Sequence, residues 1–317
     1  MDNRVIVITG PTATGKTGVA VETALAIGGE VVSADSMQIY RGMDIGTAKV
    51  RAGEMKNVPH HMIDVASPWE NYSVSRYVEE ASRACDDILA RGKTPVIAGG
   101  TGLYIDSLIA GREFAGNDGD AGIRAGLEAE YDQFGGAAML KRLGEVDPER
   151  AAKLFPGDKR RLVRAMEVFL VTGETITSHD ERTRQIPPRY EALRFALSFE
   201  DRADLYERID RRVDQMMEDG LLEEVTGLLG GRTDFSGLPT AWGAIGYKEI
   251  LRALAGELSL SEAVELIKME SRRYAKRQLT WLRRREDVAW ILWQGAPDIA
   301  SGARKVLESW GSAGMRE

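Results

Sequence analysis

The sequence has little cysteine and histidine and no long apolar run. Cys85 is the only cysteine among 317 residues, so an intrachain disulfide is excluded and a reducing compartment is expected. No apolar stretch approaches the roughly 20 residues that a membrane-spanning helix needs. The N-terminus also lacks the basic and apolar regions of a signal peptide. We therefore expect a cytoplasmic protein with no membrane partner, in which Cys85 packs inside a helix as a small apolar residue.

Patterns that bind transition metals are equally sparse. A zinc-finger tail is excluded because there is no pair of cysteines. His60 and His61 are adjacent in "PHHMIDV", which reads as a short strand. Neighbouring side chains on a strand point to opposite faces, so these two histidines are not expected to share one ion.

A surplus of basic charge is also absent, because the formal net charge is −7. Phosphate binding depends on local clusters, however, and two basic clusters are present. The first is "DKRRLVR", residues 158–164. The second is "KMESRRYAKRQLTWLRRR", residues 268–285, in which only Glu270 opposes eight cations and two aromatic residues are interleaved. The usual interpretation of such helices is a solvated face, but this composition favours a surface that binds nucleic acid.

Strand and helix patterns alternate over the first third of the chain. Buried strands are expected at residues 4–9, 29–36, 59–65 and 94–99, with helices over 16–27, 73–92 and 101–109. This alternation predicts an α/β fold, with a parallel sheet of the P-loop NTPase type covered by helices on both faces. Residues 116–189 follow a Gly- and Asp-rich linker and are expected to be a helical insertion. The core domain then comprises residues 1–115 and 190–317, where one more strand and three helical stretches are expected.

The segment "GPTATGKT" has the form of a phosphate-binding loop between a strand and a helix. Its glycines allow backbone N–H groups to point inward, its lysine adds a full positive charge, and the hydroxyl of Thr17 can ligate Mg²⁺. The residues expected to bind a diphosphate or nucleotide here are Gly10, Pro11, Thr12, Ala13, Thr14, Gly15, Lys16 and Thr17. The loop alone does not tell which phosphate compound is bound.

Asp35 follows the second strand and begins the segment "DSMQIY". Gln38 can read an adenine edge and Tyr40 can stack on a base, so a carboxylate beside them suggests a nucleobase amine as nucleophile. The alternative is that Asp35 only orders the phosphate loop or a metal ion. Ligands of parallel sheets bind beyond the carboxyl ends of the strands. Residues 10–17, 35–38 and 99–101 are therefore expected to meet in one cleft.

Three functions remain open at this point. The chain could be a kinase, or an isopentenyltransferase that acts on a free adenine nucleotide. It could be an RNA-binding module in which the phosphate loop is a nucleotide switch without chemistry. It could also be a transferase that consumes a diphosphate and acts on RNA. An enzyme for a small nucleotide needs neither the helical insertion nor the basic C-terminal helix, and a binding module leaves Asp35 and Thr101 unexplained.

The ordered set of segments resembles the tRNA dimethylallyltransferase family. The matching segments are "GPTATGKT", "DSMQIYRGMDIGTAK", "PHHMIDV", "YSV", "AGGTGLY", "RLVRAMEVF", "AIGYKE" and "YAKRQLTWLR". The resemblance implies transfer of a dimethylallyl group from dimethylallyl diphosphate to the exocyclic amine of the adenosine 3′-adjacent to the anticodon, with release of diphosphate. It also implies Mg²⁺ as cofactor and the tRNA anticodon stem-loop as partner. We expect the chain to act as a monomer.

The resemblance also assigns roles to residues. Asp35 becomes the general base, and Thr101 faces the leaving-group oxygen and the tRNA, although a threonine there could equally cap the following helix. Arg208 or Arg212 is expected to reach the diphosphate. The residues expected to contact tRNA are Asp35, Ser36, Met37, Gln38, Thr101, Arg124, Arg160, Arg161, Leu162, Val163, Arg164, Gly243, Ala244, Ile245, Gly246, Tyr247, Lys248, Lys276, Arg277, Gln278, Leu279, Thr280, Trp281, Leu282 and Arg283.

Overall fold

The computed structural model describes residues 3–112, 114 and 120–314, and the chain divides into two compact units. Residues 1–109 and 189–317 form the first unit, and residues 110–188 form the second. The linker expected at residues 115–122 lies mostly outside the described residues. The two units have separate hydrophobic cores.

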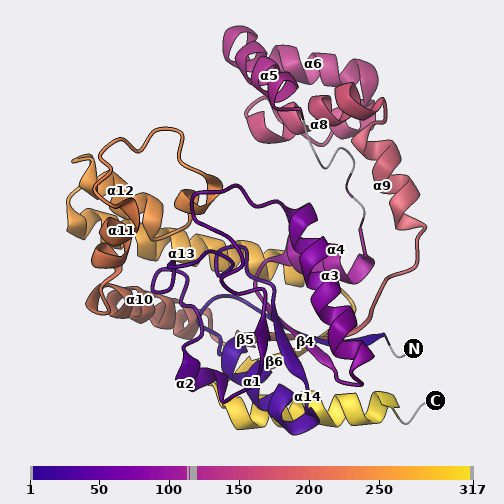
Figure 1. Ribbon diagram of the computed structural model, residues 1–317, viewed down its shortest axis with the longest axis vertical. Coiled ribbons are helices and arrows are strands. Elements are labelled where there is room, and N and C mark those ends of the chain that lie inside the picture. Colours follow the sequence, from indigo (N-terminus) through magenta and orange to yellow (C-terminus); the bar gives the residue numbers. More distant parts are fainter. Residues whose placement is uncertain (1–2, 113, 115–119, 315–317) are drawn as a thin grey trace. The chain divides into compact units, whose positions relative to one another are not determined.

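A parallel sheet lies at the centre of the first unit (Figure 1). Within the described residues it has six strands in the order β3-β2-β4-β1-β5-β6. The strands are β1 (Arg4–Thr9), β2 (Glu30–Ser33), β3 (His60–His61), β4 (Pro95–Gly99), β5 (Glu191–Phe199) and β6 (Val288–Trp293). In β1, the β-branched run from Val5 to Ile8 is fully buried, as expected for a central strand that is covered on both faces. The predicted α/β class with a parallel sheet is confirmed.

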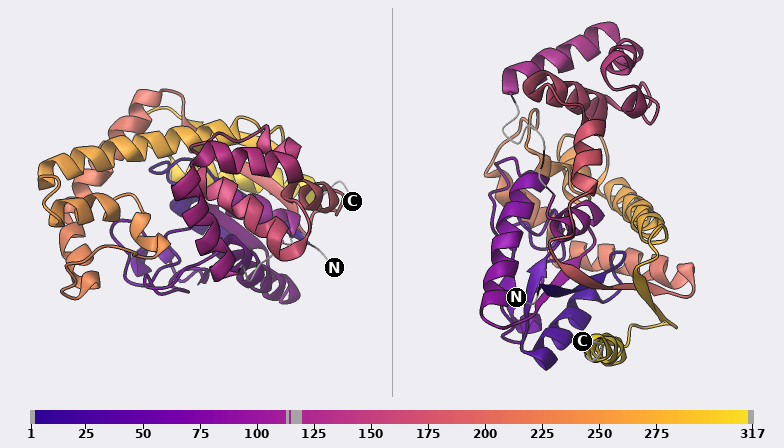
Figure 2. Two further views of the ribbon diagram at one scale, coloured as in Figure 1. Left: turned by 90° about the horizontal axis from the view of Figure 1, so that it is seen from above. Right: turned by 90° about the vertical axis from the view of Figure 1, so that its right-hand side faces the viewer.

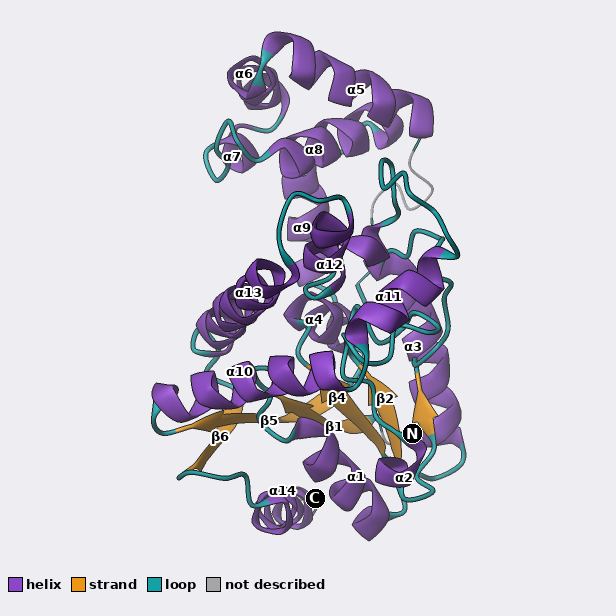
Figure 3. Ribbon diagram, turned by 90° about the vertical axis from the view of Figure 1, so that its left-hand side faces the viewer, coloured by secondary structure: helices purple, strands orange, loops and turns teal. Residues whose placement is uncertain are grey.

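Helices cover both faces of this sheet (Figure 3). On one face, α1 (Lys16–Ile27) packs against α14 (Ile299–Gly314). On the other face lie α3 (Val74–Ala90), α4 (Gly102–Ala110) and α10 (Arg202–Glu218). The other helices of this unit are α2 (Ala52–Met55), α11 (Leu221–Leu229), the 3₁₀ helix η1 (Thr240–Gly243), α12 (Tyr247–Leu254) and α13 (Leu260–Leu282).

The second unit is helical, and no strand occurs among the residues of it that the structure describes. Its helices, magenta to rose in Figure 2, pack against one another. They are α5 (Ala121–Phe134), α6 (Gly136–Val146), α7 (Pro148–Ala151), α8 (Lys159–Thr172) and α9 (Ile176–Arg184). Leu127, Met139, Leu143, Leu162 and Met166 form the centre of its core.

The sequence interpretation was wrong about strand β6, which we had expected to be part of a helical stretch. The run "VAWILW" is short enough to suit either structure. Its burial alternates, since Ile291 and Trp293 are buried whereas Trp290 and Leu292 are exposed. That period of two belongs to a strand, and pairing with residues 194–199 of β5 selects it. The expected third strand is also shorter than its sequence suggests, because β3 contains only His60 and His61.

Two expectations about single features can be compared with the structure. Cys85 is fully buried, and burial raises the pKa of its thiol to about 12, so it packs as an inert apolar residue.

Across the described part of the chain, every helix is too short or too polar to span a bilayer.

A buried acid at the start of strand β2 gives a first testable prediction. Glu30 is 3 % exposed and binds Arg91, Lys93 and His61. The hydrogen bond from Arg91 is the largest cause that lowers the pKa of Glu30. Glu30→Gln removes the charge that these partners share, so the free energy of unfolding in urea should fall by about 1–3 kcal/mol. Because the pKa is lower in the folded state, this contribution is present above the unfolded pKa near 4.5 and is lost as the pH falls toward the folded value.

The matched control for Glu30 is Glu79→Gln on α3, where Glu79 and its partner Arg83 are both exposed. Exposed pairs contribute little, so this variant should stay within about 0.5 kcal/mol of the wild type. Equal losses for the two variants would show that burial of Glu30 adds no stability.

Candidate active site

The phosphate loop connects β1 to α1 and needs glycine at two positions. Gly10 has φ +144° and a Cβ there would clash with the carbonyl oxygen of Leu197. Gly15 has φ +84° and forms the N-terminal boundary of α1. Only glycine adopts such conformations without strain. The predicted strand, turn and helix are therefore all present, and the positive end of the helix dipole faces the loop.

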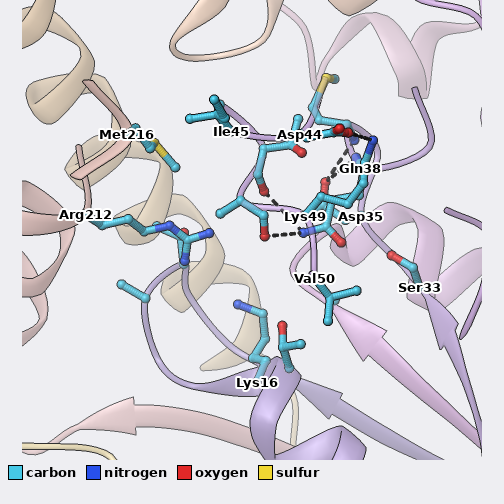
Figure 4. A pocket seen from close by; sticks show the side chains of 18 of the residues that line it. Lys16, Ser33, Asp35, Gln38, Asp44, Ile45, Lys49, Val50, Arg212 and Met216 are labelled. Carbon is cyan, nitrogen blue, oxygen red and sulfur yellow. Dashed lines mark hydrogen bonds and ion pairs between the residues drawn. The ribbon is translucent and has the colours of Figure 1, made fainter. Parts of the chain in front are cut away.

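Three cationic side chains surround this loop. The amino group of Lys16 donates a hydrogen bond of 2.6 Å to the carbonyl of Pro11, and Arg208 Nε donates one of 3.2 Å to the carbonyl of Ala13. Figure 4 shows the ends of Lys16 and Arg212 pointing into the same hollow. Burial, and then the positive charge of Arg212, lower the pKa of Lys16 to about 7. The structure thus places both Arg208 and Arg212 beside the loop, where the sequence left a choice between them.

Gln278, which lies on α13 far along the chain, forms a hydrogen bond with the phosphate loop. Its Oε1 accepts a 3.3 Å hydrogen bond from the backbone N–H of Thr12, and its Nε2 donates one of 2.9 Å to the carbonyl of Gly100. The side chain is only 7 % exposed. Its amide therefore joins the loops that follow β1 and β4, and Gln278 also lines the cavity described below, so its contact with RNA stays a prediction. The indole N–H of Trp293 also binds the loop, at the carbonyl of Thr14. Sequence patterns did not reveal either contact.

Asp35 lies in a turn beyond the end of β2. Its Oδ1 accepts hydrogen bonds from the backbone N–H groups of Met37 at 2.9 Å and Gln38 at 3.4 Å. The hydroxyl oxygen of Thr101 accepts a 3.0 Å hydrogen bond from the N–H of Ser36. The Thr101 side chain thus links the β2 and β4 loops. The loops that follow β1, β2 and β4 therefore lie close together, as predicted.

These loops open into a cavity of about 1300 Å³ in the first unit. Its walls include the phosphate loop, the Asp35 turn, residues 44–50 and Arg212 (Figure 4). Tyr274 and Arg277 of α13 also line it. Burial raises the pKa of Tyr274 to about 12, so its hydroxyl remains protonated and can donate a hydrogen bond. Pockets for small ligands typically measure roughly 300–1000 Å³, so this cavity is larger than most of them.

Two side chains that were expected to read a base are already engaged. Tyr40 is 1 % exposed and belongs to the core, so it cannot stack on RNA. The amide nitrogen of Gln38 donates to the carbonyls of Thr47 at 3.2 Å and Ala48 at 3.3 Å. Gln38 therefore cannot offer both a donor and an acceptor to adenine while these bonds persist.

The basic segment 268–285, which comprises the end of α13 and the three residues after it, carries two kinds of cation. Glu270 is the only acid within this segment, but four of the cations form ion pairs, mostly with acids on other elements. The pairs are Lys268–Asp214, Arg272–Asp210, Arg273–Glu270 and Arg285–Asp106. The other four are exposed and form no ion pair with a described residue; they are Lys276, Arg277, Arg283 and Arg284. These four, with the exposed Thr280, define the surface that we call the α13 face.

Of the residues of α13 that were expected to contact RNA, Leu279 and Leu282 are buried and Trp281 is half-buried. Leu279 and Leu282 are buried in the core, because helical periodicity turns them away from the α13 face. The indole N–H of Trp281 donates a 2.9 Å hydrogen bond to Asp106. These side chains hold α13 in place.

The segment 243–248 presents only part of its surface. Tyr247 is fully buried, so its side chain is not available to RNA. Gly243, Ala244, Ile245 and Lys248 line the cavity. Gly246 precedes α12 and has φ +99°, a backbone conformation that glycine adopts without the strain that a side chain would cause.

In the helical unit, Arg124 and Arg164 both bind the buried carboxylate of Glu167. Arg160 and Arg161 are exposed at the start of α8. Leu162 and Val163 lie in the core of this unit. The side chains of Leu162 and Val163 therefore serve packing within this unit, and contact of the segment with RNA stays a prediction.

The parallel sheet with a phosphate loop after its inner strand β1 places the chain among P-loop-like proteins, and similarity to known proteins identifies the family. The family model described as IPP transferase matches residues 38–285, and that described as Isopentenyl transferase matches residues 3–67. The chain therefore belongs to the tRNA dimethylallyltransferase family of prenyltransferases.

Individual relatives are similar over nearly the whole chain. The tRNA dimethylallyltransferase of Geobacter sulfurreducens is 48% identical over 289 residues, and that of Caldanaerobacter subterraneus is 45% identical over 289 residues; each match covers 91% of both chains. The solved tRNA isopentenylpyrophosphate transferase of Bacillus halodurans is 38% identical, with a TM-score of 0.71 over 98% of this chain and 96% of that one. A eukaryotic dimethylallyltransferase acting on tRNA is 30% identical, with a TM-score of 0.79 over 92% of this chain and 74% of that one.

Proposed function

We propose that this prenyltransferase transfers a dimethylallyl group from dimethylallyl diphosphate to the exocyclic amine of the adenosine 3′-adjacent to the anticodon in tRNA. The observation that supports this most is the shared cavity, which is lined by both Lys16 of the phosphate loop and the carboxylate of Asp35. A leaving diphosphate and an attacking amine need these two groups on opposite sides of one carbon atom.

The diphosphate side of the reaction needs positive charge that is already in place. As the bond between the allylic carbon and oxygen breaks, negative charge accumulates on the diphosphate. The N–H groups of the loop, Lys16 and Arg212 face the position where that charge develops. Arg208 also lines the cavity and holds the loop through the carbonyl of Ala13.

The residues present fit Mg²⁺ held mainly by substrate. Mg²⁺ commonly keeps several waters and is bound by one or two protein oxygens together with phosphate oxygens. The exposed hydroxyl of Thr17 lies beside the loop and lines the cavity, so it would be such a ligand. When bound, Mg²⁺ would neutralise charge on the diphosphate.

On the acceptor side, Asp35 acts as the general base. The adenosine nitrogen forms a bond to the allylic carbon, the diphosphate leaves with the electrons of the carbon–oxygen bond, and the amine proton passes to the carboxylate. The turn hydrogen bonds to Oδ1 fix the orientation of this carboxylate. General-base assistance of this kind contributes roughly 10²–10⁴ in rate.

The target adenosine must leave its stack to reach the cavity. Enzymes that modify base atoms extrude the nucleotide at a cost of a few kcal/mol. The unpaired cations of the α13 face are suited to bind the phosphates around it, since Arg277 both lines the cavity and is exposed.

The test uses labelled dimethylallyl diphosphate with two acceptors, an unmodified anticodon stem-loop and free adenosine monophosphate. Label on the stem-loop alone is expected. Label on the free nucleotide would favour an enzyme of adenine nucleotides, and the absence of label on both would favour an RNA-binding module without this chemistry.

The α13 face gives a prediction about affinity. Arg277→Ala should weaken stem-loop binding by roughly three- to tenfold and reduce the slope of log K against log[salt] by about one unit, because one phosphate contact is lost. The measurement is a filter-binding titration at several salt concentrations.

The control for Arg277 is Arg83→Ala, which removes the same charge from an exposed residue of α3 that pairs with Glu79. Its salt slope should match the wild type. An unchanged slope for Arg277→Ala would remove that contact from the account.

A further inference from the structure

One wall of the cavity, residues 44–50, is held by an acid far along the chain. Glu224 of α11 accepts backbone hydrogen bonds from Asp44 at 2.9 Å and Ile45 at 2.7 Å through Oε2. It accepts a third from Gly46 at 3.2 Å through Oε1. Three successive N–H groups therefore end on one carboxylate, and the path of this wall depends on the position of Glu224.

A fourth donor fixes Glu224 itself. The hydroxyl of Tyr247 donates to Oε1 of Glu224. The ring of Tyr247 is fully buried against Gly46, where a Cβ would clash with it. Burial raises the pKa of Tyr247, so its hydroxyl stays protonated and continues to donate. The carboxylate is held between α12 and the wall.

The same wall leads directly to the Asp35 turn. The amide nitrogen of Gln38 donates to the carbonyls of Thr47 and Ala48, and the backbone N–H of Gln38 donates to Oδ1 of Asp35. Glu224 is thus connected to Asp35 through hydrogen bonds to both ends of segment 44–48, the backbone of that segment, and Gln38.

We propose that Glu224 is a positioning residue that holds the Asp35 carboxylate in place for proton transfer. This inference rests on the proposed function, because it concerns the same general base. Glu224 is not among the residues that line the cavity, so it acts through the wall and not on the substrate.

The decisive variant is Glu224→Gln, assayed in the full chain with labelled dimethylallyl diphosphate and the anticodon stem-loop. A glutamine of the same size offers one acceptor oxygen, and its NH₂ group opposes backbone donors. The wall should shift, and misplacement of a catalytic group by about 1 Å can cost roughly 10²-fold in rate. We expect the single-turnover rate to fall by about 10- to 100-fold, while stem-loop affinity stays within about threefold of wild type.

Glu223→Gln is the matched control. Glu223 is the neighbouring acid in the first turn of α11, and the structure gives it no bond to the wall. Its rate should equal that of the wild type. If Glu224→Gln folds poorly, Tyr247→Phe keeps the buried ring and removes one donor, and we expect it to slow the reaction by about three- to tenfold.

A double-mutant cycle separates positioning from general stability. If Glu224 and Gln38 act through one set of bonds, Glu224→Gln combined with Gln38→Leu should be little slower than the slower single variant. Multiplied effects, or a Glu224→Gln rate equal to wild type, would overturn the inference while leaving the proposed function intact. If the wild-type enzyme transfers no label, the proposed function fails, and this inference fails with it.

Discussion

Asp35→Asn is expected to lower the rate of prenyl transfer by at least about a hundredfold while tRNA affinity stays nearly unchanged. Asparagine retains an oxygen that can accept the turn hydrogen bonds from Met37 and Gln38, but it cannot accept the amine proton. Asp35→Ala should be at least as slow and should also loosen the turn, because both hydrogen bonds to Oδ1 are lost. Single-turnover rates and stem-loop binding measured on both variants distinguish the base from the turn.

Two results would contradict this role of Asp35. If Asp35→Asn retains its rate within about threefold, the carboxylate does not take the proton. If affinity for the stem-loop falls as far as the rate, Asp35 is a binding residue, and another group must act as the base.

Lys16→Ala is expected to lower kcat/KM for dimethylallyl diphosphate by about 10²–10³-fold, because a full positive charge is removed where the leaving group develops negative charge. Arg208 and Arg212 remain beside the loop, so weak donor binding should persist. Steady-state kinetics with the stem-loop at saturation provide the measurement. A loss of less than about fivefold would show that the diphosphate does not lie against Lys16.

The lowered pKa of Lys16 leads to a prediction about how donor affinity depends on pH. Its pKa is about 7 in the free protein, mainly because it is buried. A bound diphosphate favours the charged form and raises this pKa, so binding above pH 7 requires uptake of a proton. Donor affinity should therefore fall as the pH rises, by up to about tenfold per unit. The Lys16→Ala variant should lose this slope, and titrations of both proteins between about pH 7.5 and 9 test it.

Features that depend on local sequence could be predicted before the structure was known. The phosphate loop needs only a strand, two glycines and a helix in succession, and its backbone conformation follows from these residues. The convergence of residues 10–17, 35–38 and 99–101 follows from the rule that ligands bind at the carboxyl ends of parallel strands.

Features that depend on distant partners could not be predicted in this way. Strand β6 is specified by its pairing with β5, about 90 residues earlier in the chain. The charge of the basic segment 268–285 also depends on distant partners, because acids on α4 and α10 form ion pairs with Arg285 and Arg272. The sequence shows the charge of a helix, but only tertiary contacts show which cations remain unpaired.

Burial explains the remaining corrections. The family resemblance marks continuous segments such as residues 276–283, whereas a helix turns only some of its positions outward. Leu279 and Leu282 therefore support the surface on which Arg277 and Arg283 are exposed. The Glu224 contacts had no sequence signal either, since one acid in a helix does not reveal which backbone groups it accepts.

The most direct test of the central claim is a structure of the protein with an anticodon stem-loop and a dimethylallyl diphosphate analogue that cannot react. The account predicts that the diphosphate lies in the loop at residues 10–17 and that an extruded adenosine presents its amine to Asp35, with the five-carbon group between them. A diphosphate bound elsewhere, or an adenosine amine beyond the reach of Asp35, would contradict it.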